Sequence, residues 1–165
     1  MDNQIYIVII EDELEVMEAL LGDLEFIEPN FPLEAANNAE EAVSVMEQIE
    51  ADGHKVGLLL CDHVLPGKNG IDLLIELQNH PTLKHSKKVL VTGQAGLEDT
   101  VQAINKAHLD YYIAKPWTKE ELQEVVTEKL TDYVIENKLN LLQYMSALNA
   151  TRLAEALREN GLTDT

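Results

Sequence analysis

The strongest constraint on the fold is a series of short apolar runs that end next to polar residues. Two of these runs, Ile5–Ile10 and Val56–Cys61, contain no charged residue and consist mainly of isoleucine, valine and leucine. Continuous apolar runs of this length are typical of strands that are covered on both faces of a sheet. Weaker runs predict three further strands, at Leu33–Ala36, Lys88–Thr92 and Asp110–Ala114. The sequence therefore predicts a five-stranded sheet.

The segments between these runs have the apolar spacing of helices. We predict helices over Glu13–Glu28, Ala39–Ala51, Ile71–Asn79, Glu98–Lys106 and Lys119–Ile135. Asn37 or Asn38 is placed to cap the second helix, and Thr118 to cap the last. Strands that alternate with helices favour a parallel sheet with right-handed crossovers and helices on both faces. We therefore expect an α/β, doubly wound (βα)5 fold with the flavodoxin-like strand order 2-1-3-4-5, since a barrel needs eight strands.

Composition restricts the class of protein. The formal net charge is −18, so the surface repels phosphate backbones and anionic lipid, and we expect no nucleic-acid partner and no membrane association. The single cysteine, Cys61, cannot form an internal disulfide. No apolar run reaches the roughly 18 residues that a bilayer span needs. Because Met1–Gln4 also lacks a basic, signal-like character, we expect a cytoplasmic protein.

The chain beyond Asn137 has a purely helical pattern. We expect one apolar face made of Leu139, Leu142, Met145 and Leu148. Thr151 is placed to cap a second short helix that runs through Leu157 and is closed by Asn160-Gly161. We therefore divide the chain into a domain over 1–136 and a helical C-terminal extension over 137–165.

The role of this extension stays open at the level of sequence. Its only basic residues are Lys138, Arg152 and Arg158, too few for a DNA-recognition surface. Three alternatives remain for it: a linker to an output domain, a contact within a homodimer, or a tail packed on the domain.

Polar side chains stand at the ends of four of the predicted strands. Glu11 and Asp12 follow the first strand, and Asp62 follows the third. Thr92 ends the fourth strand, and Lys115 follows the fifth. Because ligands bind outside the carboxyl ends of parallel strands, we expect these side chains to meet at one edge of the sheet. Three clustered carboxylates repel one another unless a cation lies among them, and oxygen ligands suit Mg²⁺. The pattern thus predicts a metal-assisted phosphoryl site.

These residues and three loop residues together form a recognisable signature. The set resembles that of chemotaxis-type receiver domains of two-component response regulators: Glu11-Asp12, Asp62, Pro66, Gly70, Thr92 and Lys115-Pro116. The resemblance covers roughly residues 4–135. It implies that residues 1–136 form a receiver domain that acts as a phosphorylation-controlled signalling switch. Such a domain is not an enzyme beyond catalysing its own phosphorylation and dephosphorylation.

The resemblance also implies roles for the acidic residues. Asp62 would be the phosphoacceptor, supplied by a sensor histidine kinase or a phosphotransfer protein. Mg²⁺, or Mn²⁺ in its place, would be bound by Asp12 and Asp62, by Glu11 through a water, and by the backbone carbonyl of Val64.

The remaining residues of the signature would transmit the signal. Lys115 would pair with Asp62 at rest and with a phosphoryl oxygen afterwards, aimed inward by a cis peptide bond before Pro116. The Thr92 hydroxyl would bind another phosphoryl oxygen, and Tyr112 would be the aromatic that rotates inward. The face of the fourth helix, fifth strand and fifth helix would then repack and signal to a downstream protein or to an output domain outside this sequence.

Residues beside the signature carry further expectations. Val64 and Gln94 occupy the positions that flank the phosphoryl group in the family, and the apolar Val64 is expected to slow its hydrolysis. We expect His63 to be a half-exposed rim residue and Cys61 a buried small hydrophobe. Trp117 is expected to cover the Lys115 loop or to pack against the last helix.

Two other functions are compatible with this kind of fold. A haloacid-dehalogenase-like phosphohydrolase would also use Asp62 as a nucleophile, but it needs an acidic residue two positions later, where this chain has Val64. A flavodoxin-like cofactor binder needs a phosphate-binding loop after the first strand, where Glu11-Asp12-Glu13 would repel a phosphate. Both are disfavoured against the receiver.

Overall fold

The computed structural model describes residues 3–93 and 96–163. Its centre is one five-stranded sheet in which every neighbouring pair of strands is parallel, in the order β2-β1-β3-β4-β5. The fold class and strand order predicted from the sequence are confirmed. The strands are β1 (Ile5–Ile10), β2 (Leu33–Ala36), β3 (Lys55–Cys61), β4 (Lys87–Thr92) and β5 (Tyr111–Ala114).

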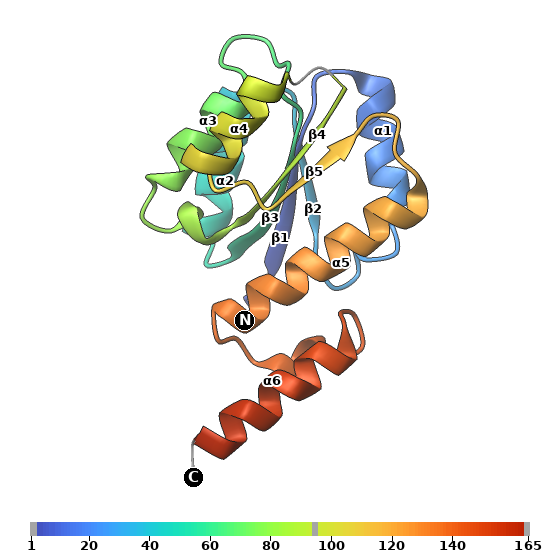
Figure 1. Cartoon of the computed structure of the whole chain (residues 1–165), viewed down its shortest axis with the longest axis vertical. Coiled ribbons are helices and arrows are strands. Elements are labelled where there is room, and N and C mark those ends of the chain that lie inside the picture. The colour runs from blue at the N-terminus through green and yellow to red at the C-terminus, as the bar shows by residue number, and fades with distance from the viewer. Residues whose placement is uncertain (1–2, 94–95, 164–165) are drawn as a thin grey trace.

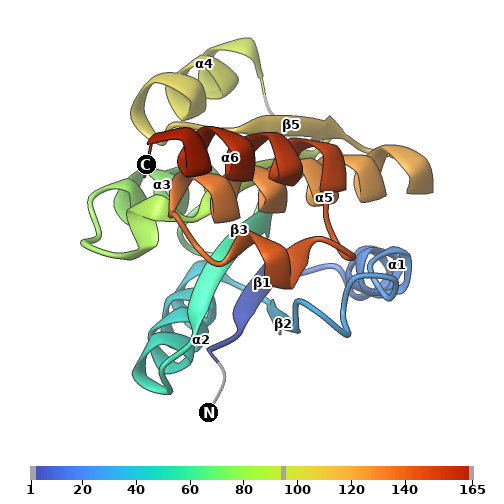
Figure 2. The same ribbon diagram turned by 90° about the horizontal axis from the view of Figure 1, so that it is seen from below.

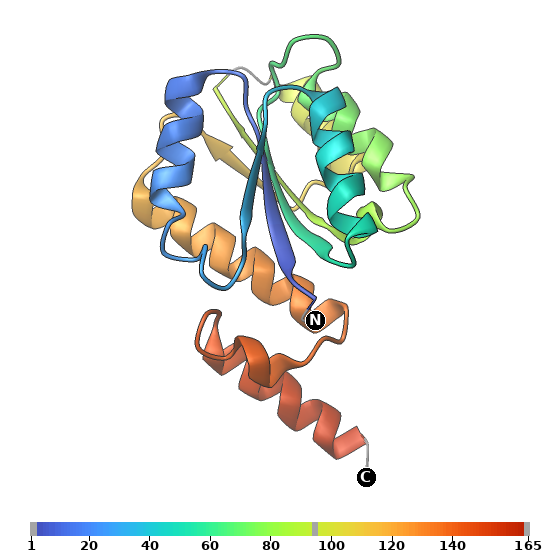
Figure 3. The same ribbon diagram turned by 180° about the vertical axis from the view of Figure 1, so that it is seen from behind.

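Helices cover both faces of this sheet (Figures 1 and 3). One apolar core lies between the sheet and α1 (Leu14–Asp23) and α5 (Lys119–Glu136). A second core lies on the opposite face, under α2 (Ala39–Ala51), α3 (Gly70–Gln78) and α4 (Leu97–Lys106). The remaining elements are the short turns η1 (Leu83–His85) and η2 (Leu141–Tyr144) and the last helix, α6 (Ala150–Thr163).

Side-chain caps fix where α2, α3 and α5 begin. The side chain of Asn38 accepts a hydrogen bond from Glu41 N at 2.8 Å, and that of Thr118 accepts one from Glu121 N at 3.1 Å. Both caps agree with the prediction. Asn69 caps α3 in the same way, at 2.8 Å from Asp72 N, so α3 begins one residue earlier than predicted.

The first predicted helix is too long by one turn and more. The helix α1 ends at Asp23, and the chain then proceeds in turns, with Ile27 N donating to Leu24 O at 3.1 Å. Pro29 lacks an N–H and disfavours a helical conformation at Glu28, so it limits how far a helix could extend in this segment. Leu24 and Ile27 are still buried, so the apolar residues keep a helical spacing beyond the last residue of the helix.

The predicted helical face over 139–148 is also wrong. Only the short turn η2 forms there, in which Leu141 and Tyr144 are buried while Leu142 is 68% exposed. The two buried residues of this turn are three positions apart, as the repeat of a 3₁₀ turn requires, and neither belongs to the predicted face. Lys138 has a φ of 54°, a left-handed conformation that separates the tail from α5.

The last helix differs from the prediction at both ends. Asn149 rather than Thr151 caps α6, since its Oδ1 accepts from Arg152 N at 3.1 Å. The helix also continues past Asn160-Gly161 to Thr163. Asn149 is fixed in the capping position because its own N–H donates to the buried Thr131 of α5, at 3.2 Å.

The tail from Asn137 onward packs on the domain beneath α5 (Figure 2). Tyr144 stacks on Phe31 with ring centroids 5.5 Å apart, and Leu153 is fully buried in the same core as α5. Arg152 pairs with Glu128 at 2.6 Å and with Asp132 at 2.5 Å, both on α5. The tail is thus packed on the domain, and its roles as a linker or as a dimer contact stay predictions. Within the described ranges, none of the helices has the length and apolarity that crossing a bilayer requires.

Candidate functional site

The strand register brings the signature residues to one edge of the sheet. Ile10 pairs with Cys61 and Cys61 pairs with Leu90, so the residues that follow β1, β3 and β4 leave the sheet side by side. Thr92 pairs with Ala114, which places Lys115 next to the end of β4. The site therefore lies outside the carboxyl ends of four strands, as ligand sites in open parallel sheets do.

Three carboxylates form the centre of this site. One oxygen from each of Glu11, Asp12 and Asp62 lies within 4.8 Å of the others. Asp12 is exposed, whereas Glu11 and Asp62 are only 1% and 5% exposed. Asp62 Oδ1 is buried and has no hydrogen-bond partner among the described residues. An uncompensated buried oxygen is costly, and a hard divalent cation that prefers oxygen ligands would satisfy it.

Lys115 is the cation that the chain itself supplies to this cluster. Its Nζ lies 2.7 Å from Oε1 of Glu11 and 3.4 Å from Oδ2 of Asp62. Burial lowers the pKa of Lys115, but the hydrogen bond to Glu11 and the charges of Asp62 and Glu11 outweigh burial and raise this pKa above its ordinary value. The ammonium therefore stays charged and offsets part of the negative charge.

Glu11 is the most constrained of the three acids. Its Oε1 accepts from Lys115, and its Oε2 accepts from Glu13 N at 3.1 Å, at the start of α1. Burial raises its pKa, and the hydrogen bonds of Lys115 and Glu13 only partly oppose this. Both oxygens already have partners, so Asp12 is the carboxylate that is open to a ligand from solvent.

Thr92 and Tyr112 are linked on the other side of the site. Thr92 is fully buried at the end of β4, and its carbonyl accepts a hydrogen bond from the Tyr112 hydroxyl at 3.0 Å. Tyr112 is half-buried and packs against the core under α2, α3 and α4. The Lys115–Pro116 peptide bond is cis.

The loop between β3 and α3 packs tightly against Asp62. A Cβ atom on Gly70 would lie 1.9 Å from the Asp62 carbonyl oxygen, so only glycine fits there. Gly70 N also donates to His63 O at 2.8 Å, which closes the loop. The sequence marks Gly70 as part of the signature, but this close approach has no signal in the sequence. Val64, in the same loop, is 52% exposed.

Two acidic residues that contact His63 and Trp117, which stand beside the signature residues, were missed by the sequence reasoning. Asp99 of α4 lies 3.8 Å from His63 Nε2. The His63 side chain is 13% exposed and therefore more buried than expected, with Nδ1 lacking a hydrogen-bond partner in the described structure. Asp23 accepts from Trp117 Nε1 at 2.9 Å, so Trp117 is tied to the end of α1. Neither acid stands at a strand end, which is the only position that the sequence pattern singles out.

Two other expectations concern neighbouring positions. Cys61 is completely buried, and burial raises the pKa of its thiol, so it is an inert hydrophobic residue as predicted. Gln94 lies outside the residues that the structure describes.

Comparisons with known proteins give a consistent identification. The chain is 24% identical to the hydrogenase transcriptional regulatory protein HoxA of Cupriavidus necator, over 86% of this chain but only 27% of that protein. It is 28% identical to the chemotaxis protein CheY of Halobacterium salinarum, over 75% of this chain and 96% of CheY. A crystal structure of a CheY-like receiver domain protein from Methanospirillum hungatei superimposes with a TM-score of 0.69, at 30% identity, over 82% of this chain and 99% of that one.

The family match covers most of the chain. Residues 7–127 match the family described as the response regulator receiver domain. This range contains the three carboxylates, Thr92 and the cis-bonded Lys115–Pro116 pair. The chain therefore belongs to the family of response regulator receiver domains, the phosphoryl-accepting switches of two-component signalling.

Proposed function

We propose that Asp62 is the residue of this switch that accepts the phosphoryl group. The main support for this proposal is the state of the Asp62 carboxylate, which is nearly buried at the end of β3. One of its oxygens lies 3.4 Å from Lys115 Nζ, and the other has no hydrogen-bond partner in the described structure. Such a group has one side held by a cation and one side open to a new ligand. Of the neighbouring acids, Glu11 has both oxygens engaged by Lys115 and Glu13 N, and Asp12 is exposed to solvent rather than held beside Lys115.

The transfer step follows from the chemistry of a carboxylate nucleophile. An Asp62 oxygen attacks the phosphorus of a phosphohistidine on a sensor kinase or phosphotransfer protein. The new O–P bond forms as the P–N bond breaks, and the electron pair of that bond leaves with the imidazole nitrogen. Lys115 is within reach to balance the charge of a phosphoryl oxygen, and Thr92 is the hydroxyl residue beside it at the end of β4.

A divalent metal would complete the site. The donor set fits Mg²⁺, or Mn²⁺ in its place, because the clustered ligands are all oxygens and Asp62 Oδ1 has no partner in the described structure. Asp12, Asp62 and the Val64 carbonyl would hold the metal directly, and Glu11 would hold it through a water. When bound, the ion neutralises negative charge on the phosphoryl oxygens.

We further propose that the output surface is the face of α4, β5 and α5. The Tyr112 hydroxyl already contacts the Thr92 carbonyl, so a shift of Thr92 toward a phosphoryl group would move Tyr112 as well. Val101 and Ile104 of α4 and Tyr111 of β5 are large hydrophobic residues that are 40% or more exposed. An exposed apolar surface of this kind is suited to a protein partner.

The wider setting is likewise part of the proposal. The chain spans about a quarter of the HoxA length, so a downstream protein or an output domain outside this sequence would receive the signal. We propose a cytoplasmic role with no direct nucleic-acid binding, consistent with the net charge of −18. Catalysis would be restricted to the domain's own phosphorylation and dephosphorylation.

The phosphohydrolase alternative is not retained. None of the three similar proteins described above is named as a phosphohydrolase. The position where such an enzyme carries its general acid is Val64, which is exposed and has no proton to donate.

The test is direct phosphorylation of the full chain by acetyl phosphate. We expect incorporation by the wild-type chain with Mg²⁺, and none after the metal is removed by EDTA. Asp62→Asn should not incorporate phosphate under either condition, whereas the matched variant Asp72→Asn, an exposed acid of α3, should behave as wild type. Phosphorylation of Asp62→Asn at the wild-type rate would refute the proposal.

A further inference from the structure

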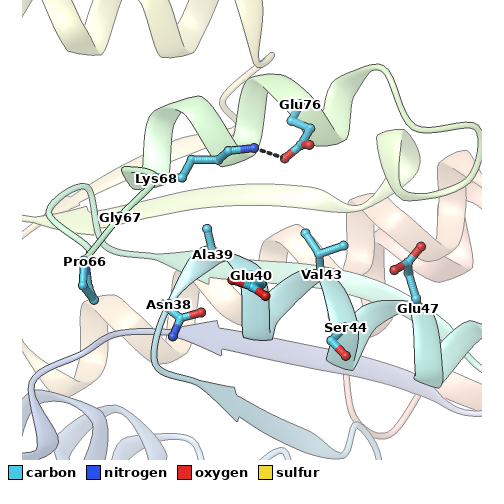
Figure 4. A pocket seen from close by; sticks show the side chains of 10 residues that line it. All are labelled: Asn38, Ala39, Glu40, Val43, Ser44, Glu47, Pro66, Gly67, Lys68 and Glu76. Atoms are coloured by element: carbon cyan, nitrogen blue, oxygen red, sulfur yellow. Dashed lines mark hydrogen bonds and ion pairs between the residues drawn. The ribbon is translucent and has the colours of Figure 1, made fainter.

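A second concave surface lies between α2 and α3. It is a groove of about 660 Å³ (Figure 4). One wall is the side of α2 that carries Glu40, Val43 and Glu47, and the other consists of the loop Pro66–Lys68 and of Glu76 on α3. A volume of several hundred cubic ångströms is typical of binding pockets. None of the carboxylates of the phosphoryl site lines this groove.

The α2 wall has a regular chemical pattern. Glu40 and Glu47 are seven residues apart, which is two helical turns or roughly 10 Å along the axis. Val43 lies between them and points into the groove, as Figure 4 shows, and it is partly buried beside the core under α2, α3 and α4. The wall therefore presents an acidic, an apolar and a second acidic group in one line.

The charges on the two walls are not equivalent. On the α3 side, Lys68 Nζ lies 2.6 Å from Oε2 of Glu76, so these two charges neutralise each other. On the α2 side, the carboxylates of Glu40 and Glu47 take part in no hydrogen bond or ion pair with the described residues. The groove thus carries two unpaired negative charges on either side of an apolar strip.

We propose that this groove docks a basic amphipathic helix of a partner protein. Two lysine or arginine residues of that helix, two turns apart, would pair with Glu40 and Glu47. An apolar side chain between them would cover Val43, in the manner of helices that bind grooves through residues at i, i+3 or i+4, and i+7. Complementary charge would orient the basic helix in the groove. It would also speed the association of that helix with this chain, whose net charge is −18.

The docked helix would also contact the phosphoacceptor loop. Pro66 and Gly67 belong to the segment that follows Asp62 and Val64, and both line the groove. The partner would therefore contact this loop from outside and leave the strand-end site uncovered.

A titration with a defined probe tests this inference. The probe is a synthetic helical peptide with two lysines two turns apart and leucines between them, added to the ¹⁵N-labelled full chain. We expect amide shifts at Ala39–Glu47 and at Gly67–Glu76. Glu40→Gln combined with Glu47→Gln should weaken binding about tenfold, because both ion pairs are lost. The matched control, Glu25→Gln with Glu28→Gln, makes the same change of charge at exposed residues elsewhere and should change affinity less than about twofold.

Several outcomes would overturn the inference. Shifts confined to α1 or α5 would show that the peptide binds another face. If the two double variants weakened peptide binding equally, binding would depend only on the total charge of the chain and not on Glu40 and Glu47. If spermine bound the groove as tightly as the peptide does, the groove would bind cations without needing an apolar side chain between them. The experiment needs no phosphorylation, so its result is independent of the function proposed for Asp62.

Discussion

The Lys115 ammonium lies nearer to Glu11 than to Asp62, at 2.7 Å from Glu11 Oε1 and 3.4 Å from Asp62 Oδ2. Glu11 is almost completely buried, and burial raises its pKa. The ion pair therefore joins the end of β5 to the end of β1 and supports a carboxylate in a place that disfavours negative charge. It also leaves Asp62 only partly engaged, which suits a nucleophile.

Replacing Lys115 should destabilise the domain. Lys115→Met would leave the buried Glu11 without its partner, and breaking a buried pair in this way costs about 3 kcal/mol. We expect this decrease in the free energy of unfolding in urea denaturation with EDTA present. In the double variant with Glu11→Gln the loss should be markedly smaller, because no unpaired charge remains. If the losses of unfolding free energy in Lys115→Met and Glu11→Gln added up in the double variant, the interaction between Lys115 and Glu11 would contribute nothing to stability.

Two glycines allow a matched test of the loop that holds Asp62. Gly70→Ala places a Cβ 1.9 Å from the Asp62 carbonyl oxygen, while a Cβ on Gly22 of α1 would have no atom within 4 Å. We expect Gly70→Ala to lose about 1 to 3 kcal/mol of stability and to slow phosphorylation by acetyl phosphate. Gly22→Ala should be neutral or stabilising by up to about 1 kcal/mol and keep the wild-type rate. Equal behaviour of the two variants would contradict the close packing at Gly70.

Lys88 predicts a specific pH dependence of stability. It is buried at the start of β4, where its ammonium donates to Gln78, Lys84 O and Ser86 O. Burial lowers its pKa to about 8, whereas the unfolded chain has the ordinary value of about 10.4. Between these two values the unfolded chain binds the extra proton, so stability should rise with pH across this window, by roughly 3 kcal/mol at most.

Lys88→Met supplies the control for this prediction. It cannot titrate, so the difference in unfolding free energy between wild type and Lys88→Met should shift in favour of wild type as the pH rises from about 8 to about 10. The comparison cancels the titration of all other groups. A difference that stays constant over this range would show that Lys88 keeps its ordinary pKa.

The packed tail should contribute to the stability of the whole domain. Leu153 of α6 is fully buried in the core shared with α5, whereas Leu142 of η2 is 68% exposed. Leu153→Ala should cost about 2 to 4 kcal/mol, and Leu142→Ala less than about 0.5 kcal/mol. Chemical denaturation should show a single transition for both variants. A separate early transition in Leu153→Ala would indicate that the tail unfolds independently.

The fold could be predicted from the sequence because it depends on local patterns. The continuous apolar runs at Ile5–Ile10 and Val56–Cys61 indicate buried parallel strands, and five βα units are too few for a barrel and favour the flavodoxin-like order. The same rule brings Glu11, Asp12, Asp62 and Lys115 to one edge, where the structure has them together. Their roles in phosphorylation are still predictions.

The features that could not be predicted depend on contacts between distant parts of the chain. The choice of Asn149 as a cap requires Thr131, which lies on another helix. The preference of Lys115 for Glu11 and the close approach of Gly70 to Asp62 appear only when the loops are placed in space. The spacing at 139–148 misled in a different way, because it is compatible with both an α-helix and a 3₁₀ turn.

In the proposed function, Asp62 itself becomes the acyl phosphate. The most direct measurement is to phosphorylate the full chain with acetyl phosphate and Mg²⁺, reduce it with borohydride, and sequence its peptides by mass spectrometry. Reduction of an aspartyl phosphate gives homoserine, so we expect homoserine at position 62 alone. Homoserine at Asp12 instead, or a phosphate that stays on His63 with position 62 unchanged, would contradict it.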